Sequence, residues 1–298
     1  MSKYVIINAD DFGMCNAANN AVKELFGLGG ITSSTIMAPC AWAPDAVKFA
    51  AEHPEYAIGV HLTTTSEWGT YRWAPVAQGD TSSLRDEEGF MWHESDQFEE
   101  HADIEQLTNE LVAQIEKLRN LGLNPSHFDN HMGSLYGIYK GRFEVLETTL
   151  GICAKYGMPF RIPATFTDAQ MNNDMLDINV PKEMIDAIFG KINAATKELR
   201  IATPDFLMPG DWAGEQDKSY DAFKEYIFEL YRNFEDDAVT ETYIHPAWEC
   251  DELKSITGCW HRRVWEYTLF KDPKTLEYFK SIGVKLINYR DLKAMRGY

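Results

Sequence analysis

Two adjacent carboxylates near the start of the chain carry the clearest chemical signal in the sequence. Asp10 and Asp11 come shortly after the apolar run Tyr4–Asn8 and precede Gly13. Neighbouring carboxylates inside a fold repel each other and lose hydration, so the pair requires a cation, a shared proton or another functional reason. Gly13 permits a sharp turn that can bring both side chains to one site. The structural alternative is an Asx turn that caps a helix beginning at Asn16.

Histidines follow two further apolar runs. His61 comes after Ile58-Gly59-Val60, and His245 comes after Ile244. A single histidine in such a place is commonly a hydrogen-bonded structural residue, which stays the alternative for each. In a βα barrel, however, both would lie at the carboxyl ends of strands, where such folds place their chemistry.

A third motif concentrates histidine and aspartate within six residues, Ser126–His131. If the segment is a strand, its period of two places His127, Asp129 and His131 on one face and Phe128 on the other. Imidazole and carboxylate groups are metal ligands and acid–base groups, and core packing does not explain three of them in a row. A solvent-facing edge strand is the alternative.

Short β-branched runs alternate with amphipathic stretches along the chain, which predicts parallel strands joined by crossover helices. The expected strands are Tyr4–Asn8, Ser34–Met37, Ile58–Leu62, Ser126–His131, Phe160–Pro163, Phe206–Met208, Thr242–His245 and Lys285–Asn288. The expected helices are Asn16–Leu28, Pro44–Glu52, Ile104–Leu121, Phe143–Tyr156, Pro181–Leu199, Tyr220–Asn233, Arg262–Phe270 and Pro273–Ile282. The alternation predicts an α/β fold with a closed or nearly closed barrel. One rim of that barrel would collect Asp10, Asp11, His61, His131 and His245.

The balance of charge excludes several classes of partner. The 298 residues include 28 Lys and Arg against 46 Asp and Glu, which gives a net charge of −18. Such a chain repels phosphate backbones and anionic headgroups, so we expect neither nucleic acid nor a membrane as partner. The polar residues that soon follow Tyr4–Asn8 do not fit a signal-peptide core, and we expect a cytoplasmic protein. The sequence leaves the oligomeric state open, a homodimer included.

Four motifs together resemble a known family. They are Asn8–Gly13, Gly59–Thr63, His127–His131 and His245-Pro246, and they are similar to the motifs of the YdjC-like carbohydrate deacetylases, in the same order. The resemblance extends from Tyr4 to about Tyr289. It implies an irregular TIM-like (β/α) barrel that removes acetyl groups from N-acetylated mono- or oligosaccharides, chitooligosaccharides being one example. It also implies one divalent metal ion, Mg²⁺ or Zn²⁺.

The resemblance implies a role for each main site residue. Metal ligands would be Asp11, His61 and His131, and the catalytic base would be Asp10. A divalent ion polarises a carbonyl and acidifies water, while Asp10 would accept the proton of the attacking water. His245 would donate a proton to the departing amine nitrogen.

Five further residues are candidates for supporting roles. His127 and Asp129 fit either hydrogen-bond partners of the ligand imidazoles or substrate contacts. Arg161 is a candidate to orient the predicted base or bind a sugar hydroxyl, the alternative being a surface arginine. Asp211 and Trp212 would hold a sugar, unless they form a turn with a packed indole.

Residues 65–100 break the alternation of strands and helices, because they are rich in aromatic and acidic residues without periodicity. Insertions of this length are usually functional or mobile. One interpretation is a lid whose aromatic faces stack on sugar rings. The other is a solvated excursion whose aromatic residues fill a satellite core. Neither interpretation requires a second domain, so we expect one domain over residues 1–298.

Other classes of function remain as alternatives. A sugar-binding or regulatory protein with a degenerate site would bind sugar without turnover. A metal-dependent sugar isomerase, phosphoesterase or other hydrolase would use a similar rim, but no Arg/Lys cluster or Gly-rich phosphate loop adjoins the motifs in the sequence. A serine hydrolase would need a G-x-S-x-G elbow, which the sequence lacks.

Overall fold

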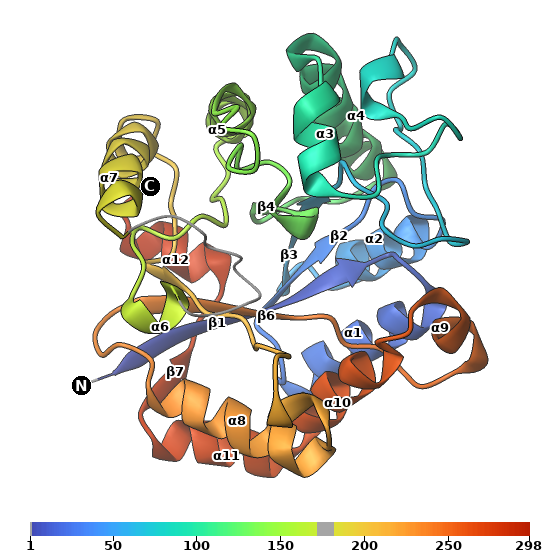
Figure 1. The fold of residues 1–298 in the computed structure, drawn as a ribbon. Coiled ribbons are helices and arrows are strands. Elements are labelled where there is room, and N and C mark those ends of the chain that lie inside the picture. Colours follow the sequence, from blue (N-terminus) through green and yellow to red (C-terminus); the bar gives the residue numbers. More distant parts are fainter. Residues whose placement is uncertain (1, 172–181) are drawn as a thin grey trace.

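The computed structural model describes residues 2–171 and 182–298, and a parallel sheet lies at its centre (Figure 1). The strands in those ranges are β1 (Lys3–Phe12), β2 (Ser33–Ile36), β3 (Ala57–Leu62), β4 (Phe128–Asn130), β5 (Phe206–Leu207), β6 (Val239–Ile244) and β7 (Val284–Leu286). Their order is β4-β3-β2-β1-β6-β5, and β7 pairs with the start of β1. Because these pairings are all parallel, the carboxyl ends of the strands lie on one side. The expected α/β class with parallel strands is confirmed, and the sheet that they form is curled (Figure 1).

Helices surround this sheet (Figure 1). The longer ones are α1 (Asn16–Leu28), α2 (Ala43–Glu52), α4 (Ile104–Leu121), α5 (Glu144–Tyr156), α7 (Lys182–Glu198), α8 (Tyr220–Arg232), α10 (Trp260–Lys271) and α11 (Pro273–Ser281). The shorter ones are α3 (Ser95–His101), α6 (Asp168–Met171), α9 (Asp251–Ile256) and α12 (Tyr289–Met295). Within the described ranges, none of the helices combines the length and hydropathy that a membrane span requires.

Helix α4 shows how sequence produces these elements. The Asp103 side chain accepts hydrogen bonds from the first backbone amides of the helix, and Gly122 ends it in the left-handed conformation. Between these caps, an apolar stripe that includes Leu107 and Leu111 is fully buried against the sheet. The predicted bounds of this helix agree with the structure. For the helix expected over Pro181–Leu199, the structure has Lys182–Glu198, and Pro181 lies outside the described residues.

The prediction of a strand at Phe160–Pro163 is wrong. Phe160 makes only an isolated bridge with Phe128, although its backbone amide also donates to the carbonyl of Ala202. Prolines at 159 and 163 flank this short segment, and proline has no amide hydrogen to extend a ladder. Among the described residues, regular strands therefore do not close the ring between β4 and β5.

Three other expected strands are shorter than predicted, and one of them, β5, lacks only Met208. Strand β4 covers only Phe128–Asn130, and a 3₁₀ turn begins directly at His131. Strand β7 ends at Leu286, because the side chain of Asn288 caps α12 by accepting from the amides of Arg290 and Asp291.

The insertion at residues 65–100 is packed against the rest of the protein. The Arg72 guanidinium is 3% exposed and donates to the carboxylate of Asp86 and the carbonyl of Met91. The indole of Trp73 is buried, and the carboxylate of Glu110 on α4 accepts the backbone amides of residues 76 and 77. These contacts favour the satellite-core interpretation of the insertion.

Candidate metal centre

A bulge in β1 lets two neighbouring carboxylates serve one site. Ala9 is paired with Ser34 and Phe12 with Ile36, so three steps along β1 match two along β2. Asp11 takes up the extra residue with a left-handed φ of 60°, a conformation that aspartate tolerates better than most residues. The sequence suggested a turn at Gly13. The chain instead changes direction two residues earlier, at Asp11.

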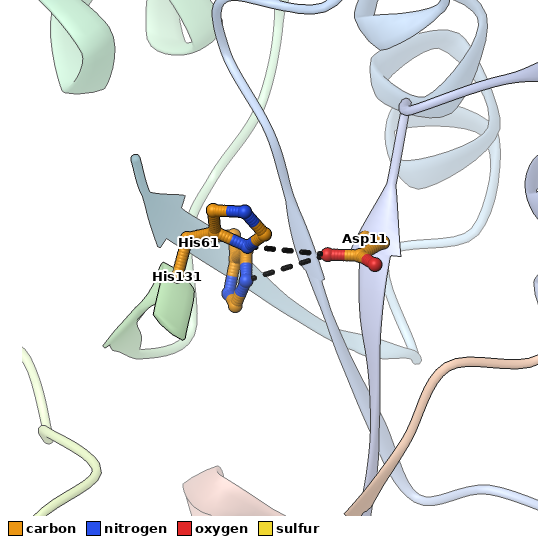
Figure 2. A group of neighbouring side chains, drawn as sticks. All are labelled: Asp11, His61 and His131. Atoms are coloured by element: carbon orange, nitrogen blue, oxygen red, sulfur yellow. Dashed lines mark ion pairs between the residues drawn. The ribbon is translucent and has the colours of Figure 1, made fainter. Parts of the chain in front are cut away.

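The bulge places the Asp11 carboxylate opposite two imidazoles (Figure 2). Its Oδ1 atom lies 3.6 Å from Nε2 of His61 and 3.6 Å from Nδ1 of His131. All three side chains are buried, and Oδ1 has no hydrogen-bond partner among the described residues. A buried carboxylate oxygen without a donor is costly unless a cation occupies the space it faces.

The electrostatic field at this point favours a cation. Burial alone would lower the pKa of His131, but Glu67 and Asp11 outweigh it and raise that pKa to about 10. Burial also lowers the pKa of His61, and Asp129 reverses the shift to a raised value. Both imidazoles are thus drawn towards the charged form by nearby carboxylates, and a divalent ion would satisfy the same negative potential.

The other ring nitrogen of each imidazole contacts a second carboxylate. Nδ1 of His61 lies 2.7 Å from Oδ1 of Asp129, and Nε2 of His131 lies 3.0 Å from Oε2 of Glu67. Such partners fix the ring orientation and leave the remaining nitrogen for a metal. One carboxylate and two imidazoles fit a divalent ion with open coordination positions. The three predicted ligands are therefore brought together, with Asp129 behind one of them.

Asp10 points to a different partner, Arg161. The two terminal nitrogens of Arg161 each lie 2.7 Å from one Asp10 oxygen, and Nδ2 of Asn8 donates to Oδ1 at 2.9 Å. The Arg161 side chain is only 3% exposed, so the surface-arginine alternative is excluded. Asp10, His61 and Asp129 also gather donor atoms within one small volume. Arg161 already forms ion pairs with both carboxylates of that second group.

His127 lies one layer behind the site. Its ring is fully buried, stacks on Tyr289 at 3.8 Å and has Nε2 3.1 Å from Oδ1 of Asn8. Burial lowers its pKa to about 3, so it is neutral at physiological pH. Strand β3 passes so close that a Cβ at Gly59 would lie 2.3 Å from the His127 carbonyl oxygen, so only glycine fits there. This burial excludes a substrate contact for His127. Its two ring nitrogens contact Asn8 and Ser126 rather than a ligand imidazole, so the other predicted role, partner of a ligand imidazole, is not found either.

His245 follows β6 at the same end of the sheet. Its backbone amide donates to Oε2 of Glu266 at 2.7 Å. Burial lowers the pKa of the His245 imidazole, and the negative charges of Asp11 and Asp10 oppose that shift only partly. The side chain is therefore within electrostatic range of both predicted key carboxylates.

The segment with Asp211 and Trp212 follows the packing alternative. The Trp212 indole is 9% exposed and stacks on Phe223 of α8 at 4.7 Å. Oδ1 of Asp211 accepts the amide of Ala213 at 2.8 Å, as in a turn. The indole also lies 6.4 Å from the ring of Trp265 on α10, so these contacts favour a packed indole over a sugar platform.

Sequence reasoning missed four charged residues around the site: Glu67, Glu241, Arg263 and Glu266. A signal existed for Glu241, because it is a carboxylate within the buried strand β6. It accepts from Nε of Arg161 at 2.7 Å and from the hydroxyl of Tyr289, and burial raises its pKa to about 7. The other three lie in the insertion or on α10, where no periodicity marks them.

The fold and the donor set define a class: an α/β protein with a parallel sheet and a carboxylate–dihistidine group at its carboxyl edge. This chain belongs to the family of YdjC-like proteins, which matches residues 4–281. It is 27% identical over 294 residues to a carbohydrate deacetylase of Enterococcus faecalis, covering 98% of each chain. It is 28% identical over 295 residues to a carbohydrate deacetylase of Geobacillus stearothermophilus, again covering 98% of each.

A solved structure extends the likeness to three dimensions. It is an Enterococcus faecalis protein described as a cellobiose-phosphate cleavage protein, and its TM-score to this chain is 0.70. The two are 26% identical, and the match covers 98% of this chain and 99% of the other.

Proposed function

We propose that this protein is a metal-dependent carbohydrate deacetylase, a hydrolase that removes the acetyl group from an N-acetylated mono- or oligosaccharide. Family membership and the similar carbohydrate deacetylases support the reaction class. The observation that carries the proposal is the unpartnered Oδ1 of Asp11, which faces one nitrogen each of His61 and His131. The fold is an irregular TIM-like barrel in this proposal, with residues 160–164 completing the ring where regular strands stop.

Asp11, His61 and His131 would hold the divalent ion, Mg²⁺ or Zn²⁺. When bound, such an ion supplies Lewis acidity towards an amide carbonyl and towards water. Asp129 and Glu67 keep the two imidazoles oriented, since each accepts from the nitrogen that does not face Asp11.

Asp10 is the general base in this proposal. Arg161 holds both of its oxygens, so the carboxylate is fixed in one orientation next to the metal ligand Asp11. A fixed carboxylate accepts the proton of the attacking water without first losing rotational freedom. Arg161 therefore supports the base, as one of its two predicted roles required.

His245 is the general acid. Because burial lowers its pKa, the protonated imidazole is a stronger acid than an exposed histidine. It would give its proton to the amine nitrogen as the carbon–nitrogen bond breaks, since an amine cannot depart as an anion. The backbone bond to Glu266 keeps the residue at the end of β6.

An acetate-release assay with a controlled metal content tests this function. Protein stripped with a chelator would be incubated with N-acetylated sugars of one to several units, before and after addition of Zn²⁺ or Mg²⁺. We expect acetate only after metal addition, at about one ion per chain. The same sugars without the acetyl group control for background acetate.

Two results would contradict the proposal. Sugar binding that needs no metal and yields no acetate would indicate a binding or regulatory protein. Phosphate release from a disaccharide phosphate, with no acetate from any N-acetyl sugar, would indicate a phosphoesterase.

A further inference from the structure

Helix α10 contacts the site at two residues that lie one turn apart. Nη2 of Arg263 donates to Oδ2 of Asp11 at 2.7 Å. This is the oxygen that does not face the imidazoles, because the 3.6 Å approaches of both rings are to Oδ1. Glu266 accepts the backbone amide of His245 at 2.7 Å. Residues three apart share one face of a helix, so one face of α10 contacts both the predicted metal ligand Asp11 and the predicted acid His245.

The helix itself is fixed against the segment after β6. The carbonyl of Arg263 accepts the amide of Ala247 at 3.3 Å. The Arg263 side chain is 12% exposed, and its guanidinium lies 5.6 Å from the ring of Trp68 in the insertion. Arg263 is therefore confined on both sides and presents its charge from a fixed position.

Asp11 needs such a restraint because of its place in the bulge. An aspartate at the end of a strand can rotate about χ2 and offer a metal either oxygen or both. A carboxylate that binds through both oxygens would occupy a position that water or substrate requires. A hydrogen bond to Oδ2 leaves only Oδ1 free to face His61 and His131.

We propose that α10 is the positioning element of the site. Arg263 sets Asp11 to one-oxygen ligation, and Glu266 sets the backbone at His245, so one helix fixes the spacing between metal ligand and acid. The inference rests on the proposed function, because it assumes that Asp11 is a ligand. Arg263 and Glu266 are positioning residues, and neither needs to touch the substrate.

Metal affinity alone does not test the role of Arg263. Removing a positive charge next to Asp11 favours cation binding, whereas freeing the carboxylate changes its geometry, so the two effects oppose or mask each other. The coordination number separates them. Bound Co²⁺ reports that number, because its visible absorption weakens as more ligands surround the ion.

The test compares Co²⁺ spectra of the wild type, R263M, R263K and R262M. Arg262 is the matched control, since it is the next residue on α10 and bonds to Asp217 at 2.6 Å. We expect R263M to lower the molar absorptivity by about two-fold as Asp11 binds through both oxygens. R262M should match the wild type. If R263M does not fold, R263K gives the test, because its single ammonium lacks the planar fork; we then expect a smaller decrease.

Glu266 is tested through the reaction. E266A removes the acceptor for the His245 amide. Relative to the wild type, we expect E266A to lower kcat more for an N-acetyl sugar than for an activated acetate ester, with an unchanged Co²⁺ spectrum. E266Q retains an acceptor oxygen and should restore kcat.

The outcomes are distinct. Folded R263M and R263K with wild-type spectra would overturn the role of Arg263. Equal losses on amide and ester in E266A would overturn the role of Glu266. A wild-type protein that binds no Co²⁺ would overturn the metal site of the proposed function, and the inference with it.

Discussion

Arg161 donates to both carboxylate oxygens of Asp10, at 2.7 Å each, while the adjacent Asp11 bonds to Arg263. Two neighbouring carboxylates thus have separate arginine partners. Both Asp10 oxygens accept hydrogen bonds from Arg161, so they are less available to a metal ion. The bond to Arg263 leaves Oδ1 of Asp11 open. This difference in partners is the physical basis for assigning Asp10 as base and Asp11 as ligand.

Asp10→Asn should retain the metal and lose turnover. The amide keeps the size of the side chain, but it cannot accept a proton at neutral pH, so we expect kcat to fall by about 10²–10⁴-fold. Elemental analysis of the purified variant would check the metal, and acetate release would check the rate. Loss of metal with Asp10→Asn would mean that the roles of Asp10 and Asp11 are exchanged.

The partner of the His131 ring should set metal affinity. His131→Ala should remove the ion, whereas Glu67→Gln should retain it with about 10–100-fold weaker binding, because Glu67 orients the imidazole. Isothermal titration with Zn²⁺ measures both. Glu87→Gln, an exposed carboxylate in the same insertion, is the control. Wild-type affinity in Glu67→Gln would show that the 3.0 Å contact is incidental.

His245→Ala should affect an amide more than an ester. An N-acetyl sugar needs a proton on its departing nitrogen, but an activated phenolate leaves without one, so the loss of kcat should be confined largely to the sugar. The ratio of the two rates is the measurement. Similar losses on both substrates, with the metal still bound and a lower melting temperature, would assign His245 a structural role.

His127 should make the fold acid-sensitive. Its pKa is about 3 in the folded protein, against 6.5 for an ordinary histidine. Between these values the unfolded chain binds a proton that the buried ring does not, so the free energy of unfolding falls as the pH falls. The contribution is at most about 1.4 kcal/mol per pH unit.

Urea titrations of the metal-free protein between pH 6.5 and pH 4 would measure this slope. His127→Gln should flatten it, and His53→Gln, at a side chain that is 40% exposed, should not. Equal slopes in the wild type and His127→Gln would place the acid sensitivity elsewhere, for example in Asp129. Burial raises the pKa of Asp129, but Arg161 and His61 outweigh that effect and lower the pKa to about 2.

The sequence predicted the elements that are specified locally. The apolar runs before Asp10, His61 and His245 are long enough to define strands, and parallel pairing brings their ends together. The segment at Phe160 misled the prediction, because an apolar pattern does not show that flanking prolines leave too few amides for a ladder.

Local sequence patterns could not predict the charged residues that contact the predicted ligands. Arg263 lies 252 positions from Asp11, and Glu67 lies 64 positions from His131. A single sequence carries no signal for such pairs, since a helix arginine or a loop glutamate is ordinary on a solvated surface. Only Glu241 broke a pattern, as a carboxylate within a buried strand.

The bulge between Ala9 and Phe12 makes chain length, as much as side-chain identity, a determinant of this site. In an unbroken ladder, neighbouring residues point to opposite faces, so one of the two carboxylates would turn away from the rim. Deleting Ala9 would restore the ladder while leaving every side chain of the centre in the sequence. The centre thus depends on the count of residues in one strand.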